Sequence, residues 1–348
     1  MTGRVALLTP FAFPSVRGNA VTVDRIARGL ANRGVELRVW DVGQTPEATI
    51  ADELGDCQPS LVHAFHAWRV GPLALKLARR AEIPLVVTLT GTDANHDLFD
   101  PARAAAVRRV LEGAAATVAF HESIAARIRA TLPDVGARLV VIPQAADLES
   151  HEPYRLAARW PMPPDRVLFL FPGGIRPVKN PRMPLEPLGR LAARDPRVRL
   201  AYAGPVLDRA EGDAVRRAIQ GLSWVRHLGT VPHHQMASLL QRADVVLNCS
   251  VSEGGMANSM LEALSLGRAV LASAIDGNRS LVEDGVTGFL FRDDRELEVR
   301  AEQLARDPGL RERLGRAGRA RVRSEYPASR EINGYLDVYR RLVPVPTT

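Results

Sequence analysis

Short runs of apolar, mostly β-branched residues alternate along the first 150 residues with longer segments of amphipathic helical pattern. This alternation predicts a parallel sheet whose strands are joined by crossover helices. The expected strands are Val5–Thr9, Glu36–Trp40, Leu61–Phe65, Leu85–Leu89, Thr117–Phe120 and Leu139–Ile142. The expected helices between them are 21–33, 72–80, 101–113 and 123–132.

Residues 151–165 interrupt this rhythm with four prolines and are interpreted as a linker. The alternation then resumes and ends in three helical segments. The expected strands of this second half are Val167–Phe171, Val198–Ala203, Val225–Leu228, Val245–Asn248 and Ala269–Ala272. The expected helices are 181–193, 207–220, 233–242, 257–266, 294–307, 309–324 and 330–342.

The pattern therefore predicts an α/β protein with two doubly wound domains, residues 1–150 and 166–327, that face each other across a cleft. The last segment, 328–348, is expected to pack back on the first domain. In open α/β sheets ligands bind beyond the carboxyl ends of the strands, so the informative residues should follow strands directly.

Composition narrows the class of protein. The chain has 348 residues, 46% of them hydrophobic, and a net charge of +7, which describes a soluble globular protein. It has no basic run with interleaved aromatic residues, so no nucleic-acid partner is expected, and at most peripheral contact with a membrane. No apolar stretch reaches 18 residues, and Cys57 and Cys249 form no C-x-x-C motif. A cytoplasmic protein is the expectation.

Two cations follow the first strand of the second half. The segment Pro172–Pro181 contains Gly174, Arg176 and Lys179. Only two of the 46 basic residues are lysines, and Lys179 is one of them. An arginine fork and a lysine point charge beyond one strand end suit a diphosphate.

Another strand of the second half is followed by an acidic residue, a glycine pair and a helix that carries a second acid. The free N–H groups at a helix start attract phosphate, and a carboxylate can accept hydrogen bonds from a ribose diol or a sugar hydroxyl. Together these features describe a site for a nucleotide–diphosphate–sugar. The candidate residues are Glu253, Gly254, Gly255, Met256, Ala257, Asn258 and Glu262, with Asn278 after the next strand.

The first half offers polar residues at its own strand ends. Gly18 and Asn19 stand at a helix start, where they form either an anion site or a plain turn. His66, Asp93 and His121 follow three strands and are candidate bases, although such a histidine is more often a structural group. A metal site at Asp93 and its neighbours is conceivable, but turn formation is the better interpretation, and no metal is expected.

The segments RPVK, SEGG…LEAL and EDGVTGFLF in combination resemble the retaining, nucleotide-sugar-dependent glycosyltransferases of family 4 with the GT-B fold. GNAVT, TGTD and HES also resemble glycosyltransferase-1-domain-containing proteins, and ASAIDGN resembles selenosugar synthases. The resemblance implies a donor domain at 166–327 and an acceptor domain at 1–150. It implies that Arg176 and Lys179 clamp the diphosphate, Glu262 holds the ribose and Glu253 the sugar, without a metal or other cofactor.

The chain departs from the family pattern at three places. Eight residues rather than seven separate Glu253 from Glu262, the usual arginine position is Gly174, and the usual cleft histidine is Thr90. The expected reaction is transfer from a nucleotide-sugar, a UDP-sugar above others, by front-face displacement with retention. The acceptor is left open among a small molecule, a lipid and selenophosphate, and a binding protein without activity is the alternative. A monomer or a homodimer is expected.

Overall fold

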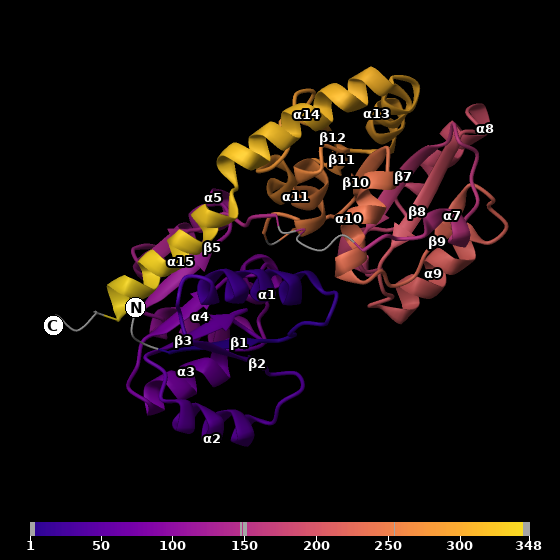
Figure 1. Ribbon diagram of the computed structural model, residues 1–348. Coiled ribbons are helices and arrows are strands. Elements are labelled where there is room, and N and C mark those ends of the chain that lie inside the picture. The colour runs from indigo at the N-terminus through magenta and orange to yellow at the C-terminus, as the bar shows by residue number, and fades with distance from the viewer. Residues whose placement is uncertain (1–3, 147, 149–151, 254, 344–348) are drawn as a thin grey trace. The chain divides into compact units, whose positions relative to one another are not determined.

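The structure is a computed structural model that describes residues 4–146, 148, 152–253 and 255–343 (Figure 1). The chain divides into two compact units. Unit 1 comprises Met1–Ala145 and Pro327–Thr348, and unit 2 comprises Ala146–Tyr326. Over the described residues, each unit contains one six-stranded sheet in which all strand pairs are parallel, with helices on both faces.

The sheet of unit 1 has the strand order β2-β1-β3-β4-β5-β6. Its strands are β1 (Val5–Thr9), β2 (Leu37–Asp41), β3 (Leu61–Phe65), β4 (Leu85–Thr88), β5 (Ala116–Ala119) and β6 (Leu139–Val141). Its helices are α1 (Gly18–Ala31), α2 (Glu47–Cys57), α3 (Gly71–Arg80), α4 (Ala104–Gly113), α5 (Glu122–Thr131), α6 (Pro133–Gly136) and α15 (Ala328–Leu342), with a π-helical turn at Asp93–Asp97.

The last helix, α15, packs beside α1 on one face of the unit 1 sheet (Figure 1). A buried ion pair joins the two helices: Arg25 Nε donates to Glu331 Oε2 over 2.8 Å and Arg25 Nη2 to Oε1 over 2.9 Å. Below it, the buried His63 lies between Tyr339 Oη at 2.6 Å and Thr88 Oγ1 at 2.7 Å. The predicted return of the C-terminal helix to the first domain is confirmed.

The sheet of unit 2 has the strand order β12-β11-β10-β7-β8-β9. Its strands are β7 (Val167–Pro172), β8 (Val198–Ala203), β9 (Val225–His227), β10 (Val245–Asn248), β11 (Ala269–Ser273) and β12 (Phe289–Phe291). Its helices are α7 (Leu156–Arg159), α8 (Leu185–Arg194), α9 (Arg209–Ile219), α10 (His233–Arg242), α11 (Asn258–Ser265), α12 (Asp276–Arg279), α13 (Asp294–Arg306) and α14 (Pro308–Glu325), with a 3-10 turn at Pro177–Lys179.

The segment interpreted as a linker is packed in its described part. Helix α7 lies within it, and Tyr154, Leu156 and Trp160 are buried in the core on one face of the unit 2 sheet. The four prolines therefore shape an entry segment that unit 2 incorporates, because the three large side chains between them bury enough apolar surface to hold it in place.

Strand order fixes where each sheet offers a crevice. The chain leaves β1 toward β2 on one side and later returns to β3 on the other, so unit 1 reverses direction between β1 and β3. Unit 2 reverses between β7 and β10. Ligands of open α/β sheets bind at the carboxyl edge beside such a switch point. The loops after β1, β3, β7 and β10 are therefore the places to search for a site.

Candidate functional site

In unit 2 the loops after β7 and β10 are joined at the switch point. The Val251 N–H donates to the Val178 carbonyl over 3.0 Å, which sets the 3-10 turn carrying Lys179 against the loop carrying Glu253. The next residue, Asn180, has a left-handed backbone (φ 48°) that turns the chain away again. Two loops that are far apart in sequence thus present an acid and a base at one point.

Lys179 and Glu253 form an ion pair through Nζ and Oε1 in a largely buried setting. The same carboxylate oxygen accepts hydrogen bonds from Ser250 Oγ at 2.7 Å and Asn248 Nδ2 at 3.2 Å. Burial raises the pKa of Glu253, but the Lys179 ammonium and these two hydrogen bonds together lower it by more. The pKa of Glu253 therefore lies below its ordinary value. The carboxyl group is ionised at neutral pH.

Helix α11 starts beside this pair. Ala257 is its N-cap, and the Ala257 side chain offers no capping hydrogen bond. Met256 and Ala257 are buried in the unit 2 core, so only their backbone can face a ligand. Gly255 is also buried, Asn258 is the first helical residue, and Gly254 lies outside the described residues. The first-turn N–H groups have no acceptor within the helix itself, which makes this start suited to an anion.

Glu262 lies on α11 and is buried. Its Oε1 is 3.0 Å from Nε2 of His233, the first residue of α10, which is itself only partly exposed. The imidazole holds Oε1 in place, and the other oxygen, Oε2, can accept a hydrogen bond from a ligand. His233 was not among the residues expected from the sequence, although a histidine directly after Pro232 at a helix start was a visible signal. Asn248, the last residue of β10, and Ser250, two residues beyond it, were not expected there either.

Three further candidates of unit 2 have structural contacts. A Cβ on Gly174 would meet Leu207 Cδ1 at 2.4 Å, so a larger residue there would displace the Leu207 side chain. Arg176 immediately precedes the 3-10 turn, and its carbonyl accepts from the Lys179 N–H over 3.0 Å. Asn278 is fully buried and donates from Nδ2 to the Ser273 carbonyl over 2.9 Å, which ties the loop after β11 to its strand.

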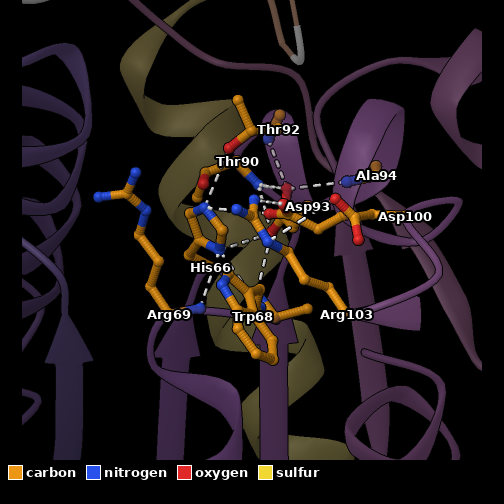
Figure 2. Close-up of polar contacts among 12 residues, drawn as sticks. His66, Trp68, Arg69, Thr90, Thr92, Asp93, Ala94, Asp100 and Arg103 are labelled. Atoms are coloured by element: carbon orange, nitrogen blue, oxygen red, sulfur yellow. Dashed lines mark hydrogen bonds and ion pairs between the residues drawn. The ribbon is translucent and has the colours of Figure 1, made fainter. Parts of the chain in front are cut away.

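In unit 1, the buried Asp93 carboxylate accepts hydrogen bonds from backbone N–H groups (Figure 2). Its two carboxylate oxygens accept N–H groups from Ala67, Thr90, Gly91 and Ala94 at 2.7 to 3.2 Å. A carboxylate with its lone pairs committed to four amides holds the loops after β3 and β4 together. The expectation of Asp93 as a base is not supported by this geometry, because proton uptake would break these bonds.

His66 is the residue directly after β3 and is buried at the centre of Figure 2. Its Nδ1 accepts the backbone N–H groups of Trp68 at 3.2 Å and Arg69 at 3.3 Å, which places the proton of the neutral ring on Nε2. Nε2 lies 3.0 Å from Thr92 Oγ1. His66 also has φ 100°, a strained backbone for a residue with a side chain. Such strain is often found at functional sites.

His121 is the N-cap of α5, and its Nδ1 is 2.6 Å from Ser123 Oγ. Gly18 and Asn19 are the first two residues of α1, at the β1 side of the switch point. The structure thus places His66, Gly18 and Asn19 along one sheet edge of unit 1, and Lys179, Glu253 and the start of α11 along one sheet edge of unit 2. Within the described ranges, no group of three or more metal-ligating side chains has the arrangement of a metal site.

Family models match both units. Residues 47–150 match Glycosyltransferase Family 4, and residues 166–307 match Glycosyl transferases group 1. A D-inositol 3-phosphate glycosyltransferase of Frankia alni is 31% identical over 285 residues, which cover 75% of this chain and 69% of the relative. Glycosyltransferase 1 domain-containing protein 1 of Xenopus tropicalis is 26% identical over 259 residues, covering 73% and 75%.

Solved structures share the fold. Anabaena Alr3699/HepE in complex with UDP and glucose superposes with a TM-score of 0.82 at 16% identity, covering 98% of this chain and 100% of that one. Sucrose-phosphate synthase from Thermosynechococcus elongatus gives 0.77 at 19% identity, covering 98% and 99%. Taken with two parallel sheets of the observed order, these matches establish that the chain belongs to glycosyltransferase family 4 and is a glycosyltransferase with the GT-B fold.

Proposed function

We propose that this enzyme transfers a sugar from a UDP-sugar to an acceptor with retention at the anomeric carbon, and that unit 2 holds the donor. The observation that carries the proposal is the Lys179–Glu253 ion pair, set beside the start of α11 at the switch point of unit 2. A cation, a helix N-terminus and two carboxylates at one edge match the parts of a nucleotide–diphosphate–sugar.

The ion pair suggests how the donor binds. The diphosphate replaces Glu253 as the partner of Lys179, and it also binds Arg176 and the first turn of α11. Glu253 loses its cation but keeps the hydrogen bonds from Ser250 and Asn248, and it accepts a hydroxyl of the sugar instead. Glu262, fixed by His233, accepts from the ribose diol. Each carboxylate is thus held in place before the donor arrives, which lowers the cost of ordering the site.

Similar solved structures support the choice of uridine. Alr3699/HepE was solved in complex with UDP-glucose as well as with UDP and glucose, and its fold covers nearly all of this chain. At 16% sequence identity, the similarity to Alr3699/HepE establishes the fold alone, so the identity of the donor is part of the proposal.

Catalysis is proposed to be mainly electrostatic. Asp93 is committed to four backbone N–H groups, so it is poorly placed as a nucleophile or base. Front-face displacement needs neither, because the leaving diphosphate takes the acceptor proton while Lys179, Arg176 and the start of α11 stabilise its charge. His66 and His121 would then position the acceptor.

The test is to incubate the protein with UDP-glucose and other UDP-sugars and a set of acceptors that includes selenophosphate, and to follow UDP release and the anomeric proton of the product by NMR. Release of UDP with an axial-to-axial outcome supports the proposal. An inverted product contradicts the retaining mechanism. UDP binding without release across all acceptors would support the alternative of a binding protein, and a selenosugar product would identify selenophosphate as the acceptor.

A further inference from the structure

Two arginines lie over one aromatic ring at the switch point of unit 1. The Arg17 guanidinium carbon is 4.0 Å from the Phe11 ring centroid, and that of Arg69 is 5.7 Å from it. Arg17 and Phe11 come from the loop between β1 and α1, while Arg69 follows β3. Two positive charges from different loops therefore share one small patch at the edge where an open sheet binds its ligand.

Neither charge is neutralised by a carboxylate. Across the described part of the chain, Arg17 and Arg69 take part in no ion pair, whereas Arg25 pairs with Glu331 and Arg103 with Asp97 and Asp100 in the same unit. The acids of the neighbouring loops are used elsewhere. Asp93 accepts four backbone N–H groups, and Asp41 accepts those of Ala12 at 2.8 Å and Gly43 at 2.9 Å. The patch keeps an uncompensated positive field, which favours an anion.

The patch is also held rigidly. Thr9 Oγ1, fully buried, donates to the Phe11 carbonyl over 2.9 Å, and Asp41 binds the next residue. The Arg69 backbone is fixed through its N–H to His66 Nδ1, and the unusual φ of His66 forms the turn that brings Arg69 round. Stacking on Phe11 then restricts the guanidinium groups themselves. Ordered forks of this kind bind phosphate bidentately at a small entropic cost.

We propose that Arg17 and Arg69, stacked on Phe11, bind the phosphate group of a soluble phosphorylated acceptor. The proposal rests on the proposed function, in which unit 2 takes the donor and unit 1 the acceptor, and it narrows the acceptor to a phosphate-type anion. The start of α1, one residue after Arg17, adds a partial positive charge on the same side. The strained His66 gains a role here as the residue that positions Arg69.

The experiment is a calorimetric titration of the UDP-saturated protein with inorganic phosphate and with glycerol 1-phosphate, so that the donor site is already filled. Each arginine is expected to contribute about 10-fold in affinity. Arg17→Ala/Arg69→Ala should therefore weaken phosphate binding about 100-fold. Arg300→Ala is the matched control: Arg300 stacks on Phe289 at 4.4 Å but is paired with Asp284, and its removal should change nothing.

The proposal is overturned if the wild type binds no phosphate, or if the double variant binds it as the wild type does. Should the double variant fail to fold, Arg17→Gln and Arg69→Gln singly must each weaken binding about 10-fold. Wild-type binding to phosphatidylglycerol vesicles but not to glycerol 1-phosphate also overturns it. UDP affinity should be equal in wild type and double variant. If the wild type binds no UDP, the donor assignment fails, while the phosphate comparison repeated without UDP still decides the anion patch.

Discussion

The two sheet edges handle charge in opposite ways. At the switch point of unit 2, acids and bases face each other: Lys179 pairs with Glu253, and His233 contacts Glu262. At the switch point of unit 1, the acid Asp93 binds backbone N–H groups and the cations Arg17 and Arg69 have no carboxylate among the described residues. At the unit 2 edge, acidic and basic side chains neutralise one another, whereas the unit 1 edge keeps the positive charges of Arg17 and Arg69.

This difference matches two kinds of ligand. A donor with both a diphosphate and sugar hydroxyls needs a cation for one end and acids for the other, and pairing them keeps the empty site stable. A ligand whose charge is a single phosphate needs cations only. Under these two proposals, units of the same α/β class serve two chemistries through the different loops that follow their strands.

The largest expected effect comes from Lys179→Ala. Removing one charge-stabilising contact to a leaving group typically lowers the rate by about 10²–10³. We expect kcat/KM with a UDP-sugar to fall by that factor. Lys76→Ala is the control, since the only other lysine forms an exposed ion pair with Glu47 on neighbouring helices and should show wild-type kinetics. Equal rates for the two variants would remove Lys179 from the site.

Asp93→Ala tests the structural side of the comparison. Losing a charged acceptor for four backbone N–H groups should lower the free energy of unfolding by about 2–4 kcal/mol. Chemical denaturation measures this effect. Asp52→Ala removes an exposed carboxylate of α2 and should cost less than about 0.5 kcal/mol. A folded Asp93→Ala protein of wild-type stability but without activity would return Asp93 to a catalytic role.

The buried His63 predicts a pH dependence of unit 1. Burial lowers the pKa of His63 to about 3. Below about pH 6.5, His63 binds a proton in the unfolded chain but stays unprotonated in the folded state. Stability should therefore fall as pH drops from about 6.5 toward 3, by up to about 1.4 kcal/mol per pH unit from this group. His63→Gln should show a flatter profile in denaturation at several pH values, and the exposed His96→Gln should not.

Glu253→Gln gives the smallest effect and the sharpest contrast. Without its carboxylate Lys179 is free for the diphosphate, so we expect UDP to bind about threefold to tenfold more tightly while transfer slows. Calorimetry with UDP and the UDP-release assay provide the two readouts. Glu211→Gln is the control, because Glu211 has an equally buried side chain, 12% exposed, but pairs with the exposed Arg182. Weaker UDP binding by Glu253→Gln would contradict the pairing account.

Sequence patterns predicted most of the fold. Apolar runs located the strands within a residue or two, since buried parallel strands have a distinct pattern. Helix α2 and the three-residue strand β12 were missed, although Ile50, Leu54 and Cys57 of α2 are buried at helical spacing. The start of α8 was placed four residues early, because Pro181 and Pro184 delay the helix to Leu185.

The candidate site could be located from the sequence but its contacts could not. Strand ends indicated Lys179 and Glu253, and strand order explains why they share one edge. The His233–Glu262 contact joins residues 29 positions apart, which no local pattern indicates. Tertiary packing likewise directs the Asp93 side chain toward backbone N–H groups, so the sequence left Asp93 open as a candidate base or a turn former.

The most direct test of the account is hydrogen–deuterium exchange of the whole chain with and without UDP. We expect slower exchange in the segments 173–180 and 249–262, where the loops after β7 and β10 meet the start of α11, and little change in the loops of unit 1. Lys179→Ala should abolish this protection at the same UDP concentration. Protection confined to unit 1, or unaffected by loss of Lys179, would contradict the assignment of the donor to unit 2.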